Sequence, residues 1–346
     1  MPSLRRYIDS LLDGRAVRVP EADLSLRQRL DLIAQHGDFS LAYSTATQDG
    51  TSYFGDARGY IAFQTKMGRH FALADPMAEP DAHADYIRRL IEAAGRPWFV
   101  QVGERTARIL SSLGYQVGKL GIDTRLVLPA HDFSGKRNET VRYSERWLGR
   151  NGYELIEDDG TAVPVSEVEQ LSVEWREGRI VRRREMAFLN RAFSAVPGEG
   201  MRRFILLGPD RRLVALLDFD PLYSGGKAIG YTTAFKRKRA DASPHSEVGL
   251  TKFAVDRFRA EGRAVVTLGL SPLAAIEPSG FAESAFWREA FRRAYDSRLI
   301  NRHRFNLQGQ AAFKRRFHGQ EEPVYIAFPK AGPMDMLALL RLLKAI

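Results

Sequence analysis

The sequence predicts an α+β protein in which mixed β-sheets are flanked by helices and two units of similar length follow one another. Short apolar runs with strand character alternate with helical stretches between residues 26 and 329. After a polar turn segment, DFSGKRN at 132–138, the same kind of element order begins again. We therefore predict a first unit over 1–135, a second over 136–330, and an amphipathic helix over 331–346.

The first unit is expected to begin with a helix and to continue as a β-meander. The apolar spacing in LRQRLDLIAQH predicts a helix over 26–36. A second helix is expected from Pro80 to about Ala94, because Gly95 and Pro97 follow it. A third is expected at 104–114, and strands are predicted at 39–45, 52–64, 70–76, 98–103 and 124–129.

The second unit shows its clearest pattern at 246–274, where a helix with one apolar face ends at Gly262 and a buried strand follows from Val265. Before it we expect helices at about 139–151, 166–177 and 185–193, and strands at 153–158, 201–208, 212–223 and 227–235. A basic helix at 304–317 and a strand at 321–329 complete the unit.

Composition restricts the classes of function. With 346 residues, 44% of them hydrophobic, the chain is long enough for a large core. Its 52 Lys and Arg against 42 Asp and Glu give a net charge of +10, which favours nucleic acid, an anionic membrane surface or phosphorylated small molecules as partners without choosing among them. The absence of cysteine excludes disulfides, thiolate metal sites and a Cys nucleophile.

The N-terminal segment predicts no secretion signal. Its apolar run is broken by Asp9, Asp13 and Gly14. No stretch of the sequence reaches the roughly 18 consecutive apolar residues of a membrane-spanning helix. We expect a cytoplasmic protein whose membrane contact is peripheral, at the inner face of the cell membrane.

Several segments, taken in order, resemble a known family. They are ALADPMA (72–78), GKLGID (118–123), DFSGKRNETVRYSERWLGRNGYEL (132–155), VVTLGLSPLA (265–274), RFNLQGQAAFKRRF (304–317) and EEPVYIAFP (321–329). Over roughly residues 70–330 the chain is similar to the catalytic domain of the aminoacyl-phosphatidylglycerol synthases, and the order of the matches carries more weight than any single motif.

This resemblance implies two tandem folds of the acetyltransferase (GNAT) type, with the active site in the cleft or tunnel between them. It also implies transfer of an aminoacyl group from aminoacyl-tRNA to a lipid hydroxyl such as that of phosphatidylglycerol, without metal or cofactor. An aminoacyl ester is already activated, so the site must position two anionic substrates, remove a proton from the hydroxyl and stabilise an oxyanion. The sequence accordingly contains no P-loop and no GxGxxG motif.

One departure from the family pattern leaves the reaction open. Where many members have Ser-Ile-Asp-Leu-Met-Arg, this chain has Ala-Ile-Gly-Tyr-Thr-Thr at 228–233, so Gly230 and Thr233 replace an acid and a base. A basic run at 236–239 either replaces the arginine or coats a loop. An acyl-CoA-dependent N-acyltransferase and a non-catalytic binder of tRNA or anionic lipid therefore remain alternatives.

Four carboxylates near the matched segments are candidate catalytic groups: Asp75, Asp123, Glu185 and Glu247. Two of them have a structural alternative. Asp75 precedes Pro76 and also fits an ordinary turn, and Asp123 also fits a solvated acid at a strand end.

The candidate substrate-binding residues are mostly basic or hydroxylic: Lys119, Thr233, Lys236, Arg237, Ser271, Arg304, Asn306, Lys314, Arg315 and Arg316. In the basic helix, Phe313 and Phe317 lie four residues apart on one face, so the cations between them are expected to be exposed and to contact phosphate of tRNA or of a lipid headgroup; a solvated basic face is the alternative. Ser271 and Pro272 also fit a helix start that follows a strand directly.

The apolar C-terminal helix, PMDMLALLRLLKAI, has two alternative positions. It packs onto the domain as a terminal helix, or it lies in a membrane interface with Arg341 and Lys344 at anionic headgroups. The interfacial position is favoured because an enzyme that modifies lipids must reach the bilayer.

Overall fold

The computed structural model describes residues 9, 11–178 and 187–345. Eleven strands of this part of the chain form one mixed sheet. From one edge to the other their order is β1 (Ser52–Asp56), β2 (Gly59–Lys66), β3 (Arg69–Met77), β4 (Trp98–Val102), β11 (Gln320–Phe328), β5 (Gln116–Val127), β10 (Val265–Pro272), β9 (Lys227–Lys238), β8 (Leu213–Ser224), β7 (Arg202–Leu207) and β6 (Glu154–Asp158).

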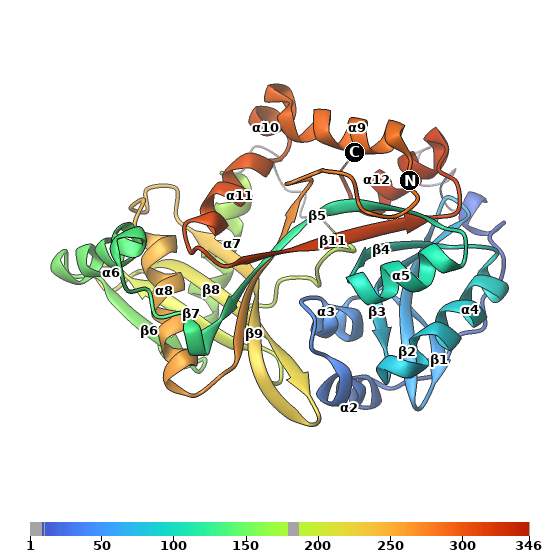
Figure 1. The fold of residues 1–346 in the computed structure, drawn as a ribbon. Helices are drawn as coiled ribbons and strands as arrows, with labels where there is room; N and C mark the ends of the chain where they lie inside the picture. Colours follow the sequence, from blue (N-terminus) through green and yellow to red (C-terminus); the bar gives the residue numbers. More distant parts are fainter. Residues whose placement is uncertain (1–8, 10, 179–186, 346) are drawn as a thin grey trace.

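Helices flank this sheet in two groups, and a third group lies above β5 and β11 in the view of Figure 1. The first half contributes α2 (Leu26–His36), α3 (Ala42–Thr47), α4 (His83–Ala94) and α5 (Glu104–Ser112). The second contributes α6 (Glu139–Arg150), α7 (Val165–Glu177) and α8 (Ser246–Ala260), and the upper group is α9 (Ala285–Asp296), α10 (Arg298–His303), α11 (Leu307–Arg315) and α12 (Pro333–Leu342). The predicted α+β class is confirmed.

The two halves repeat one strand pattern and exchange a strand. In the first half, β1, β2 and β3 are antiparallel and β4 is parallel to β3. In the second, β7, β8 and β9 are antiparallel and β10 is parallel to β9. However, β5 pairs with β10 of the second half, while β11 pairs with β4 of the first. Residue 135 remains our proposed division along the chain, but the exchange joins both halves into one sheet.

The packing of apolar side chains accounts for the position of most helices and strands. One cluster fills the second half, where Phe204 of β7 and Phe219 of β8 are in edge-to-face contact with each other and with Phe258 of α8. A second cluster packs α4 and α5 onto the first half. The predicted helix at 26–36 is α2, and it begins with a complete capping box between Ser25 and Gln28.

Three sequence predictions of local structure are wrong. Residues 42–45 of the strand predicted at 39–45 belong to α3. The segment is buried, and the hydroxyls of Thr45 and Thr47 donate to carbonyl oxygens of the preceding turn. Residues 187–193 form no helix, and the rest of the helix predicted at 185–193 lies outside the described residues. No helix starts at Ser271, because β10 continues to Pro272.

The C-terminal helix is also placed differently from our expectation. Ala338, Leu339 and Leu342 of α12 are buried in a cluster with Met67 and Phe71. Arg341 reaches Asp9, with 2.5 Å between Nη1 and Oδ1. The apolar face of α12 is therefore covered by the protein, and the prediction of a free interfacial helix is wrong.

Candidate functional site

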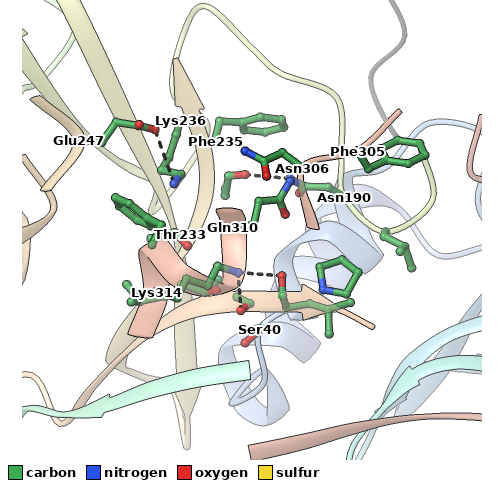
Figure 2. Close-up of a pocket in the computed structure, with 18 of the residues that line it drawn as sticks. Ser40, Asn190, Thr233, Phe235, Lys236, Glu247, Phe305, Asn306, Gln310 and Lys314 are labelled. Carbon is green, nitrogen blue, oxygen red and sulfur yellow. Dashed lines mark hydrogen bonds and ion pairs between the residues drawn. The ribbon is translucent and has the colours of Figure 1, made fainter. Parts of the chain in front are cut away.

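A cavity of about 600 Å³ lies where segments of both halves meet (Figure 2). Residues 232–237 of β9, residues 268–270 of β10 and the segment 304–306 before α11 form much of its wall. The first half contributes Ser40, Leu41 and Gln101. Seven sequence-predicted residues line it: Thr233, Lys236, Arg237, Glu247, Arg304, Asn306 and Lys314.

Lys314 is buried in the wall of this cavity. The register between β10 and β5 shifts at Gly269, where φ is 74°, and this bulge places two carbonyl groups near α11. The Lys314 amine donates to the carbonyl oxygens of Gly269 and Leu270, both at 2.7 Å. The expectation that Lys314 is an exposed cation is wrong, whereas Arg316 is exposed as expected.

Burial lowers the pKa of Lys314 to about 7, although the nearby carboxylate of Asp123 acts in the opposite direction. A neutral lysine amine has two N–H groups and one lone pair. Both N–H groups can serve the two carbonyl acceptors, so the lone pair is left to accept a proton. Lys314 is thus a group that can act as a general base near neutral pH.

Asp123 is connected to the cavity through a chain of hydroxyl groups. Ser40 donates to Asp123 Oδ2 and lies 2.8 Å from the hydroxyl of Thr267. Thr267 in turn donates to Thr232 at 2.8 Å. Burial raises the pKa of Asp123, while Ser40 and Lys314 favour its ionised form. The carboxylate therefore lies behind the cavity wall and acts on the cavity through Ser40 and Lys314.

Glu247 lies at the opposite wall and is held by lysines. Burial alone would raise its pKa, but Lys236 and Lys238 outweigh that effect and the pKa is lowered. Its carboxylate oxygens are 3.6 Å from Lys236 Nζ and 3.0 Å from Lys238 Nζ. Glu247 is thus ionised at neutral pH, which suits electrostatic positioning better than proton abstraction.

Aromatic rings place the two basic side chains of β9. The Lys236 amine lies 3.5 Å from the centre of the Phe313 ring. The guanidinium of Arg237 lies 3.8 Å from the Trp175 ring centre and is almost fully buried. Asn306 caps α11 by accepting from Gly309 N–H at 3.0 Å, and it also lines the cavity.

The cavity wall contains a carboxylate that the sequence reading missed. Asp220 of β8 is paired in the sheet with Thr232, and Arg191 binds its carboxylate with two nitrogens at 2.8 to 3.2 Å. At Gly230, by contrast, an added Cβ would lie 1.9 Å from the carbonyl oxygen of Val265. This backbone has no room for the family's acid at position 230, but an acid–guanidinium pair lies one strand away.

The remaining predicted residues lie away from the cavity or outside the described residues. Asp75 accepts the N–H of Gly103 at 3.0 Å and thereby holds β3 to the start of α5, so it does not project into the cleft. Lys119 lies 3.6 Å from Glu277. Ser271 is buried within β10, Arg315 pairs with Glu321 at 2.7 Å, and Glu185 is not described.

Neither a metal cluster nor a membrane span is found in the described part of the chain. Within residues 9, 11–178 and 187–345, no group of three or more His, Asp or Glu side chains is arranged to hold a metal ion. Over the same residues, every helix is too short or too polar to cross a bilayer.

The site is thus a cavity between two repeated α+β units, lined by basic side chains and with the buried Lys314 in its wall. The family model described as "Phosphatidylglycerol lysyltransferase, C-terminal" matches residues 30–328. The chain belongs to this family, which confirms the resemblance found in the sequence. Membership supports a transferase acting in aminoacyl transfer to lipid.

Solved structures agree with this fold. The C-terminal domain of a candidate lysylphosphatidylglycerol synthetase from Agrobacterium fabrum is 22% identical with a TM-score of 0.74, covering 91% of this chain and 94% of that chain. L-PGS from Bacillus licheniformis is 18% identical with a TM-score of 0.75, covering 94% and 99%. FemX is 8% identical with a TM-score of 0.54, covering 92% and 99%. No curated protein matches the chain.

Proposed function

We propose that this protein transfers an aminoacyl group from aminoacyl-tRNA to the hydroxyl of an anionic phospholipid such as phosphatidylglycerol. The observation that carries the proposal is Lys314, a buried lysine with a lowered pKa in the wall of a cavity, in a chain of the phosphatidylglycerol lysyltransferase family.

In the proposed reaction the neutral Lys314 amine takes the proton from the lipid hydroxyl. The hydroxyl oxygen then forms a bond to the carbonyl carbon of the aminoacyl ester. The tetrahedral intermediate collapses by breaking the bond to the ribose oxygen of the tRNA, and that oxygen takes the proton back from Lys314. One ester replaces another, so no nucleotide is hydrolysed.

Basic and amide groups around the cavity suit two anionic substrates. Arg304 lies exposed at the rim, while Lys236 lies deeper and pairs with Glu247. Asn306 and Gln310 bring amide groups to the same wall as Lys314 (Figure 2). We propose that these groups hold phosphate and stabilise the oxyanion, and that the protein works at the cytoplasmic face of the membrane.

A lipid extract of cells tests the proposal. Cells that express the protein should contain a new lipid whose mass equals phosphatidylglycerol plus one aminoacyl residue, and mild alkali should remove the added group because it is an ester. Cells that express Lys314→Met at an equal level should lack this lipid. An alkali-stable N-acylated product would instead support an acyl-CoA-dependent acyltransferase, and an unchanged lipid profile would support a non-catalytic binder.

A further inference from the structure

Helices α9 and α10 expose apolar side chains that are not packed in the hydrophobic core. Phe286 and Leu299 are each 70% exposed, the largest exposed fractions among the large apolar side chains of the described residues. Neither helix contains a buried residue. The opposite face of α9 is anchored, because Trp287 and Phe291 pack against the cluster that includes α12, and the Trp287 indole donates to Ala331 O at 3.3 Å. Phe286 is therefore held outward on a fixed helix.

The same surface is rich in arginine. Residues 285–304 contain six arginines and two acidic residues. Arg293 is 78% exposed and lies seven residues after Phe286, on the same face of α9. Arg298 and Arg302 are exposed, lie four residues apart on one face of α10 and flank Leu299. We call Phe286, Arg293, Arg298, Leu299 and Arg302 the α9–α10 surface.

This surface is followed directly along the chain by residues that line the cavity. α10 ends at His303, and the next two residues, Arg304 and Phe305, line the cavity. Figure 1 shows α9 and α10 side by side along the upper edge of the molecule, above β5 and β11. A flat partner lying on α9 and α10 would thus meet the cavity rim at Arg304.

We propose that the α9–α10 surface docks the protein onto an anionic phospholipid bilayer. Exposed Phe and Leu beside arginine match the boundary between headgroups and acyl chains, where apolar side chains insert and cations meet phosphate. A polynucleotide would be met by the arginines alone and would leave Phe286 and Leu299 in water. The inference deepens the proposed function, since the bilayer is the source of its lipid acceptor.

Vesicle flotation of the full chain tests this surface. The probes are vesicles of phosphatidylglycerol with phosphatidylcholine, and vesicles of phosphatidylcholine alone. The wild type should float with the anionic vesicles only. Phe286→Ser with Leu299→Ser should lower the partition coefficient at least tenfold, and Arg298→Gln with Arg302→Gln about twenty-five-fold, because each arginine near an anionic surface contributes about fivefold.

Two matched double variants serve as controls. Val165→Ser with Val196→Ser removes exposed apolar side chains elsewhere, and Arg88→Gln with Arg105→Gln removes exposed arginines from α4 and α5. Both should float like the wild type, and circular dichroism should show all variants folded.

Four results would overturn the proposal. They are equal flotation of the α9–α10 variants and the wild type, equal losses in the controls, loss of tRNA binding in a filter assay with unchanged flotation, and a change of oligomeric state with unchanged flotation. Flotation requires neither tRNA nor turnover. Failure of the docking surface is therefore distinguishable from failure of the proposed transfer reaction.

Discussion

Replacing Lys314 by methionine is expected to lower kcat at least a hundredfold, because a positioned general base contributes roughly a hundredfold to ten-thousandfold. Methionine keeps the length of the side chain but cannot accept a proton. In the wild type the rate should rise with pH and level off above an apparent pKa of about 7, where Lys314 becomes neutral. A pH–rate profile of transfer measures both effects.

Two further lysine variants separate the role of the base from that of charge. Lys314→Arg keeps a cation that does not deprotonate, so it should be as inactive as Lys314→Met. Lys227→Met removes an exposed lysine at the start of β9, outside the cavity, and should retain activity. Full activity of Lys314→Arg would show that the positive charge matters and that Lys314 is not the base.

Replacing Arg191 by methionine should lower the free energy of unfolding by about 3 to 5 kcal/mol, because it leaves the buried carboxylate of Asp220 without its partner. Burial already raises the pKa of Asp220, while Arg191 opposes that shift. Without Arg191 the folded-state pKa rises further above the unfolded value. The variant should therefore lose more stability as pH rises above about 4. Urea denaturation at several pH values measures this.

The double variant Arg191→Met with Asp220→Asn provides the control. It removes the buried charge, so it should recover most of the lost stability and most of the pH dependence. If the single variant loses less than about 1 kcal/mol, or if the double variant is no more stable than the single one, the pair does not stabilise the cavity wall as described.

Local patterns predicted those elements that have one apolar face or clear caps. α2, α4, α5 and α8 follow from helical spacing and from the turn residues that end them. α3 was missed because a helix buried on all sides has no polar face to reveal its period. The exchange of β5 and β11 was not predictable, because strand patterns identify strands but not their partners.

The candidate site was predicted in part, for a similar reason. The family match at 304–317 identified Lys314, and the basic run at 236–239 indicated β9, but the helical spacing around Phe313 and Phe317 suggested that Lys314 is exposed. Its burial depends on the bulge at Gly269, 45 residues away in sequence. Ser40 and Asp220 carried no motif signal, and Ser40 reaches Asp123 and Thr267 across 83 and 227 residues.

The most direct test of the proposed reaction identifies the donor. Purified protein is incubated with phosphatidylglycerol and tRNA carrying radiolabelled aminoacyl groups, and label is counted in the organic phase. The account predicts a labelled lipid that disappears after pretreatment of the donor with ribonuclease and does not form when acyl-CoA replaces the tRNA. A product that forms from acyl-CoA and survives ribonuclease would contradict it.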